Sequence, residues 1–161
     1  MTTMTGTTGT VQVYRVYIRA TPEAIWEAIT TPEWTQRYGY GSPVEYELRP
    51  GGAYRGLATA EMKAMGGEDV VVDGEVLEAD PPRRLVQTWR ARWLGEGFTR
   101  LTWEIEEGDS GVTTLTVTHD VDGAPSTAAQ VAGTVPNAGG GWSYILSDLK
   151  TLLETGRPLA G

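Results

Sequence analysis

The chain has 161 residues and a formal net charge of −8, from 13 Lys and Arg against 21 Asp and Glu. This acidic balance argues against a surface for nucleic acid or anionic membrane, since both need positive charge. The chain contains no Cys and 1 His, so it offers no disulfide, no thiolate nucleophile and no multi-histidine metal centre. We therefore expect no metal and no cofactor. Its aromatic residues are mostly 6 Trp and 7 Tyr, which suit the walls of pockets and interfaces.

Residues 1–10 contain six Thr and two Gly and no apolar run, which predicts a disordered tail rather than a signal peptide. No stretch approaches the roughly 20 apolar residues of a membrane span. We expect a cytoplasmic protein with a single domain over residues 11–157 and a short tail at 158–161.

The first elements are a strand and two short helices. Alternating β-forming residues run from Val11 to Ala20, with apolar groups on both faces, so the inward parity stays open. Thr21–Glu23 (TPE) combines an N-cap, a first-turn proline and a favourable acid, which predicts a helix start. Thr31–Glu33 repeats this signal, and Gly39 ends the second helix.

Six further strands are predicted by alternation between polar, Gly-rich or Pro-rich turns. The segment from Glu61 to Asp69, with Gly66 and Gly67, is predicted as a loop. Together with the first strand this gives about seven strands in an antiparallel meander. The six are Val44–Arg49, Ala53–Thr59, Val70–Ala79, Arg84–Trp93, Phe98–Glu107 and Val112–Asp120.

The end of the chain is helical. Ser126–Gly133 is a short candidate helix, and a long amphipathic helix then ends at Gly156 and Pro158. The fold class is therefore α+β, with a curved sheet whose concave face is covered by the long helix. A twisted sheet and a straight helix tend to leave space between them, which is a candidate ligand cavity. The apolar stripe of the helix consists of Trp142, Ile145, Leu146, Leu149, Leu152 and Leu153.

This order of elements resembles the START-like (SRPBCC, birch-pollen-allergen-like) helix-grip superfamily. It is most similar to the AHSA-like branch, homologues of the activator of heat-shock-protein ATPase. The resemblance implies a cavity for lipids, polyketides, hormones or other small apolar molecules, and only some members are catalysts. It covers roughly Val11 to Gly156 and rests on Ala20–Trp26 (ATPEAIW), Thr31–Glu33 (TPE), Arg49–Gly52 (RPGG), Gly74–Glu78 (GEVLE), Asp80–Val86 (DPPRRLV), Thr88–Trp89 (TW), Thr114–His119 (TLTVTH) and Gly141–Trp142 (GW).

Two departures from the family pattern concern the expected cavity. Many members carry Trp-Trp after the second helix, where this chain has Arg37–Tyr40 (RYGY). Many carry an aromatic residue before Thr88, where this chain has Gln87. A polar Gln87 alters ligand preference if its face points inward.

The candidate ligand-binding residues combine aromatic, polar and apolar side chains. Trp142, which follows the glycines 139–141, is expected to shape the pocket mouth, and those glycines to form a hinge. His119 is a candidate for acid–base chemistry because its ordinary pKa lies near neutrality. A structural histidine is the favoured interpretation, since no positioned partner is evident, so no catalytic residue is assigned. The full set is Trp34, Tyr38, Tyr46, Tyr54, Gln87, Trp89, Trp103, His119, Trp142 and Leu146.

The strands also carry a basic stripe of Arg83, Arg84, Arg90 and Arg92. In an acidic chain we expect its partners to be carboxylates on neighbouring strands.

The leading hypothesis is a non-catalytic protein that binds a small hydrophobic or aromatic molecule between the sheet and the last helix. Three alternatives stay open. The AHSA-like branch includes proteins that protect antibiotic producers, which implies sequestration of, or self-sacrifice to, an enediyne or polyketide. A polyketide aromatase/cyclase or hydrolase would use His119 and a Tyr. A co-chaperone of a heat-shock ATPase is disfavoured because the resemblance is to one isolated domain. We expect a monomer or homodimer with no nucleic-acid or membrane partner.

Overall fold

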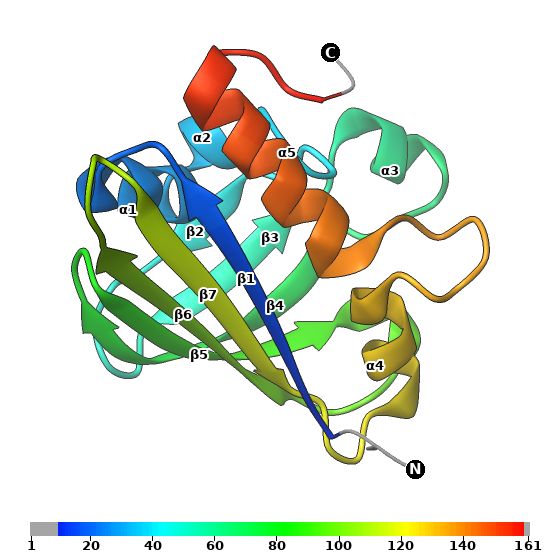
Figure 1. Ribbon diagram of the computed structural model, residues 1–161. Helices are drawn as coiled ribbons and strands as arrows, with labels where there is room; N and C mark the ends of the chain where they lie inside the picture. The colour runs from blue at the N-terminus through cyan, green and yellow to red at the C-terminus, as the bar shows by residue number, and fades with distance from the viewer. Residues whose placement is uncertain (1–9, 160–161) are drawn as a thin grey trace, which may run out of the picture.

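The computed structural model describes residues 10–159, so the predicted tail at 1–10 and the end of the one at 158–161 lie largely outside them. One antiparallel sheet of seven strands has the order β1-β7-β6-β5-β4-β3-β2 (Figure 1). The first strand therefore pairs with the last, so that β1 and β2 form the two edges of an open, curved sheet. The strands are β1 (Val11–Ile18), β2 (Val44–Tyr46), β3 (Ala53–Leu57), β4 (Val70–Asp80), β5 (Arg84–Ala91), β6 (Thr99–Glu107) and β7 (Thr113–Asp120).

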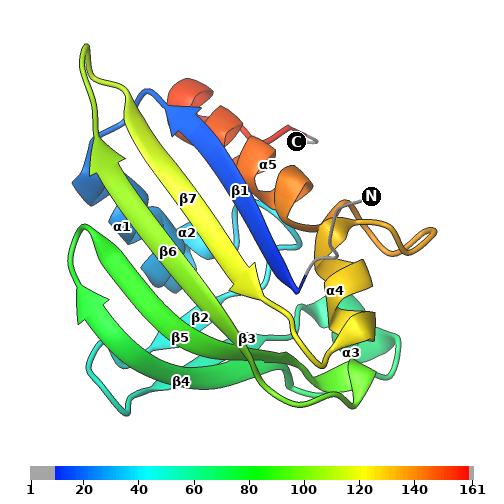
Figure 2. The same ribbon diagram turned by 60° about the horizontal axis from the view of Figure 1, so that its bottom comes forward.

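The helices lie on one side of this sheet, as Figure 2 shows with the strands in front of α1, α2 and α5. Thr21 caps α1 as the sequence predicts, because its Oγ1 accepts a hydrogen bond from Ala24 N at 3.1 Å. Helix α5 crosses the concave face and buries Trp142, Leu146, Leu149 and Leu152. The helices are α1 (Pro22–Thr30), α2 (Pro32–Thr35), α3 (Ala60–Ala64), α4 (Pro125–Ala132) and α5 (Gly141–Thr155), with a 3-10 turn η1 at Arg92–Leu94.

Strand registers decide which residues face the core. In β1 the even positions from Gln12 to Ile18 are the more buried ones, while Val13 and Tyr17 are each 57% exposed. This settles the parity that the sequence left open. In β6 and β7, Leu101 pairs with His119 and Trp103 pairs with Val117, so these buried side chains share the concave face.

Four predicted boundaries were wrong. The expected loop at 61–69 contains α3, whose start is capped by Thr59 Oγ1 accepting from Met62 N at 3.2 Å. Strand β2 ends at Tyr46, two residues before the exposed Leu48. Helix α2 ends at Thr35 rather than near Gly39. Strand β5 ends at Ala91, where the 3-10 turn carries Trp93 to the surface.

None of the helices in the described part of the chain is long and apolar enough to cross a membrane.

Candidate functional site

The centre of the interior is aromatic and polar rather than aliphatic. Trp89 on β5, Trp103 on β6 and Trp142 on α5 are 6–8% exposed, and they surround the fully buried His119 and Gln87. Trp103 and Trp142 meet edge to face with ring centroids 5.3 Å apart. The strands of the concave face and the first turn of α5 therefore bring five of the sequence-predicted residues together.

His119 lies in a directional chain of hydrogen bonds. Trp142 Nε1 donates to His119 Nδ1 at 3.1 Å, which requires that Nδ1 carries no proton. The ring proton is therefore on Nε2, 2.7 Å from Thr99 Oγ1. The Thr99 hydroxyl in turn donates to the carbonyl oxygen of Trp89 at 2.9 Å. Both nitrogens of the imidazole are thus occupied by protein groups.

Burial lowers the pKa of His119 from 6.5 to about 4, because the charged imidazolium would lose its hydration. The neighbouring Asp120 carboxylate opposes this shift only in part. Protonation at Nδ1 would also place two donors, Nδ1–H and the indole N–H of Trp142, against each other. His119 is consequently a neutral group that fixes the orientation of Trp142.

Gln87 is the second polar centre. Its Oε1 accepts from Tyr46 OH at 2.6 Å and from Trp103 Nε1 at 3.3 Å. The Trp103 ring links this centre to Trp142 and so to His119. The hydrogen-bonded centres around His119 and Gln87 therefore lie against the same aromatic side chains. Their members come from β2, β5, β6, β7 and α5.

Three predicted tyrosines line the same interior. Tyr46 and Tyr54 have ring centroids 4.7 Å apart, and Tyr38 donates its hydroxyl to Ala28 O at 2.8 Å. Burial raises the pKa of all three hydroxyls above the ordinary value of 10.0, so each stays protonated at neutral pH.

The two remaining candidates belong to the same hydrophobic core or pack against it. Trp34 is half-buried near the surface, with the guanidinium of Arg37 lying 4.6 Å from its ring centroid. Leu146 is 3% exposed and belongs to the apolar stripe of α5.

Two groups that sequence reasoning missed support the site. Thr99 is the partner of His119, and its inward parity two residues before Leu101 was an available signal. Asp148 is 2% exposed on α5 and accepts from Gly39 N and Leu159 N, each at 2.8 Å. Asp148 could have been noticed in the sequence, because it is a carboxylate directly beside Leu149 of the apolar stripe of α5.

The two hollows that stand out on the described residues lie outside this interior. The larger, about 850 Å³, is an open groove on the outer face, lined by residues such as Arg15, Arg84 and Glu104. The smaller, about 170 Å³, lies among Glu68, Arg90 and Glu96. The side chains of the aromatic and polar cluster beneath α5 are almost completely buried.

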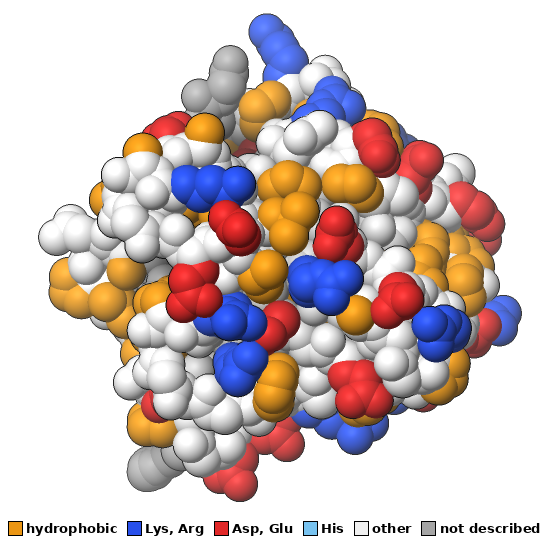
Figure 3. Space-filling view, turned by 180° about the vertical axis from the view of Figure 1, so that it is seen from behind, with side chains coloured by type: hydrophobic (Ala, Val, Ile, Leu, Met, Phe, Trp, Pro, Cys, Tyr) orange, Lys and Arg blue, Asp and Glu red, His pale blue; other side chains and the backbone are white. Residues whose placement is uncertain are grey.

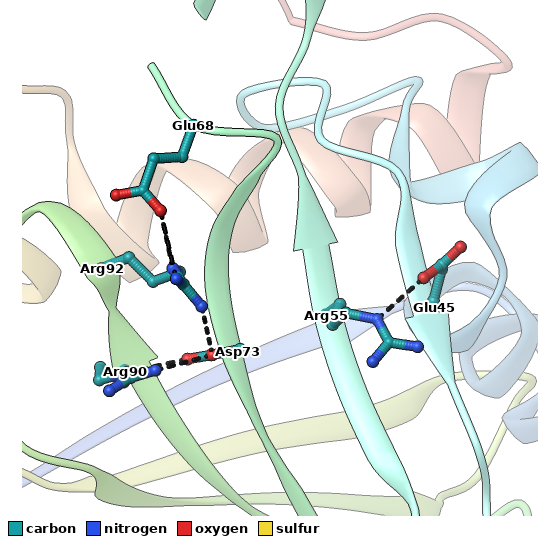
Figure 4. Close-up of polar contacts among 6 residues, drawn as sticks. All are labelled: Glu45, Arg55, Glu68, Asp73, Arg90 and Arg92. Carbon is teal, nitrogen blue, oxygen red and sulfur yellow. Dashed lines mark hydrogen bonds and ion pairs between the residues drawn. The ribbon is translucent and has the colours of Figure 1, made fainter.

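The outer face of the sheet carries paired charges. Asp73 accepts from both Arg90 and Arg92, which also contacts Glu68, and Arg55 pairs with Glu45 on the neighbouring strand (Figure 4). Burial alone would raise the pKa of Asp73, but the hydrogen bonds from the two arginines outweigh it and lower that pKa.

Arg84 likewise binds Glu78 and Glu104. The predicted pairing of the basic stripe with carboxylates is confirmed. Figure 3, which views the face opposite that of Figure 1, shows the intermixed acidic and basic side chains.

A curved seven-stranded antiparallel sheet that encloses a C-terminal helix, with two short helices after its first strand, defines the helix-grip class. The chain belongs to the family described as activator of Hsp90 ATPase homolog 1-like protein, whose profile matches residues 19–154. Both the fold class and the family predicted from the sequence are confirmed. No curated protein matches the chain.

Several solved structures share this fold. CalU16 from Micromonospora echinospora is 20% identical with a TM-score of 0.67, over 92% of this chain and 76% of that one. DynU16, from the dynemicin biosynthetic locus, is 26% identical with a TM-score of 0.69, over 94% of this chain and 49% of that one. PFC0360w, an HSP90 activator from Plasmodium falciparum, is 20% identical with a TM-score of 0.64, over 93% of this chain and 99% of that one.

Proposed function

We propose that this domain binds a small planar aromatic molecule between the concave face of the sheet and α5, without catalysing a reaction. The observation that carries the proposal is the composition of the interior, where three tryptophans surround the hydrogen-bonded groups of Gln87 and His119. Ligand sites combine apolar and aromatic walls with a few placed polar groups.

The state of His119 supports the non-catalytic part of the proposal. The imidazole is neutral, and its two nitrogens are held by Trp142 and Thr99. A general base needs a lone pair within reach of the substrate, and this arrangement offers none. The aromatase-type alternative would require Trp142 to release Nδ1 first.

Entry of a ligand requires side chains to move, because the candidate binding residues of the interior are almost completely buried. Trp142 is the wall residue on the helix rather than on the sheet, and it directly follows Gly139–Gly141. Gly139 and Gly141 have φ of +92° and +65°, a backbone region that side-chain-bearing residues disfavour. We therefore place the moving part at the start of α5, with the ligand stacked between Trp142 and the tryptophans of the sheet.

The test is a titration of two- and three-ring aromatic compounds, polyketides and fatty acids, followed by calorimetry and by chemical shifts of the indole N–H groups. Planar aromatic compounds are expected to bind at micromolar concentration and to shift the Trp142 resonance. Binding weaker than millimolar for every compound would refute the proposal. Chromatography of the same mixtures detects turnover, which would overturn the non-catalytic part.

Two tryptophan variants form a matched pair for this titration. Trp142→Leu removes one stacking face and should weaken binding about 3- to 10-fold, since aromatic pairs contribute about 0.5–1.5 kcal/mol beyond burial. Trp93→Leu is the control, because Trp93 is 57% exposed in the 3-10 turn. Equal effects of the two substitutions would contradict the assigned position of the ligand.

A second candidate is sequestration of an antibiotic of the enediyne or polyketide class. It is favoured by the likeness to DynU16, which is 26% identical over 94% of this chain and belongs to the dynemicin biosynthetic locus. The test is protection of plasmid DNA from cleavage by such an antibiotic, with mass spectrometry of the protein to detect self-sacrifice. Unprotected DNA at a protein excess would refute it.

A further inference from the structure

Gln87 is fully buried at the centre of the interior. It pairs with Val76 of β4 and with Leu101 of β6, and it is 0% exposed. Its amide group offers two acceptor sites on Oε1 and two protons on Nε2. All four have to be satisfied inside the protein, because no solvent reaches the side chain.

The orientation of the amide is fixed by its neighbours. Trp103 Nε1 can only donate, so the atom that faces it at 3.3 Å must be the amide oxygen. The Tyr46 hydroxyl donates to the same oxygen at 2.6 Å. Both acceptor sites of Oε1 are therefore used, and Nε2 points away from these two donors.

The amide nitrogen is incompletely satisfied. Among residues 10–159 its acceptor is the carbonyl oxygen of the adjacent Thr88, at 3.3 Å, which uses one of its two protons. The second proton has no protein acceptor in that part of the chain. Buried donors in native proteins are nearly always paired, so an unpaired one calls for a bound group.

We propose that Gln87 Nε2 donates this proton to a carbonyl oxygen of the ligand, so that the domain selects uncharged aromatic ketones and quinones over the corresponding hydrocarbons. This inference rests on the proposed function and specifies the ligand class of the same site. The ligand is uncharged because the polar groups around it are neutral amide, hydroxyl, indole and imidazole groups. The buried carboxylate of Asp148 is already occupied by Gly39 and Leu159.

The test compares fluorenone with fluorene, which share a three-ring frame and differ by one carbonyl oxygen. Calorimetry on the wild-type protein should show at least 10-fold tighter binding of fluorenone, equivalent to about 1.4 kcal/mol. In Gln87→Met, which keeps the chain length without the amide, the two affinities should agree within about twofold. Val86→Ala, on the same strand, is the control and should keep the preference.

A second measurement does not depend on the folding of the variant. In the wild-type protein, fluorenone should move the two side-chain amide proton resonances of Gln87, and fluorene should leave them in place. If both compounds bind equally and the amide resonances do not respond to fluorenone, the inference is wrong while the proposed function stands. NMR cross-peaks between these amide protons and a buried water would also overturn the inference if they persist when fluorenone is bound. The water, and not the ligand, would then be the acceptor of the second proton. If neither compound nor any other planar aromatic binds, the proposed function itself fails.

Discussion

The neutral state of His119 makes a quantitative prediction for acid stability. The pKa of the side chain is about 4 in the folded protein, against 6.5 as its ordinary value. Between these values the unfolded chain binds one more proton than the folded one, so stability falls as the pH falls. The neutral His119 makes its full contribution to the free energy of unfolding above pH 6.5, and this contribution is lost as the pH drops towards 4.

The size of the effect follows from the two pKa values. Each pH unit of the window corresponds to about 1.4 kcal/mol per proton. Lowering the pH from 7 to 5 should therefore reduce the free energy of unfolding by about 2 kcal/mol, and a further drop to pH 4 brings the loss to about 3 kcal/mol. Carboxylates with lowered pKa values, such as those of Asp73 and Glu96, lose their contribution only below their ordinary values of 3.8 and 4.5. The interval from pH 6.5 to 5 thus isolates the histidine.

The assay is urea unfolding at half-unit pH steps, monitored by tryptophan fluorescence, for the wild type and for His119→Gln. The variant should show a nearly flat dependence in this interval, although its overall stability is lower. Because the chain has 1 His, a proton NMR titration of its ring reports the pKa directly. A ring titrating near pH 6.5, or equal pH slopes in the two proteins, would refute the assignment of a buried neutral imidazole.

Three substitutions test the supports of the site by urea unfolding. Thr99→Val removes the acceptor of His119 Nε2–H and the hydroxyl that donates to the Trp89 carbonyl, and it should cost about 2–4 kcal/mol. Thr118→Val on the outer face should cost under about 0.5 kcal/mol. Equal costs would contradict the hydrogen-bond chain through His119. Gly141→Ala should cost about 1–3 kcal/mol, because φ is +65° and the new Cβ would lie 2.2 Å from the Val131 carbonyl oxygen. An unchanged urea midpoint would refute the strain assigned to this position. Leu149→Ala should cost about 2–5 kcal/mol, since Leu149 is fully buried on the inward face of α5, and a loss below about 1 kcal/mol would mean that the helix packs differently.

Local sequence signals predicted the elements well where one face is apolar and the ends carry clear caps. The inward set Leu101, Trp103 and Ile105 has a period of two, and each of these residues is buried in β6. The signals failed in α3, where the glycines at 66 and 67 outweighed a capped run of helix formers in the prediction. They failed again at Trp93. Alternation along β5 would point this side chain inward, but the 3-10 turn after β5 exposes it to solvent.

The candidate site was predictable as a set of residue types but not as a set of contacts. Eight of the ten candidate side chains are 0–8% exposed, and the other two, Trp34 and Tyr46, are half-buried. Trp142, which was expected to shape a pocket mouth, is itself only 6% exposed. A pocket and a packed core use the same apolar periodicity, since both place aromatic residues on the inward face. Only side-chain volumes in three dimensions distinguish a filled interior from an open one.

The sequence by itself determined the fold class and the number of strands, because alternation, helix caps and turn residues act over a few neighbouring positions. The family was identified separately, through the resemblance of its motifs to a known family. The tertiary structure decided the chemistry of the interior. The partners of His119 are 20 and 23 residues away, and Tyr46 is 41 residues from Gln87. Strand register and the placement of α5 bring these groups together. The indole N–H of Trp142 then places the proton of His119 on Nε2, and the donors Trp103 and Tyr46 fix the direction of the Gln87 amide. Hydrogen-bond geometry and desolvation have no counterpart in residue spacing, so neither property could be derived from the chain alone.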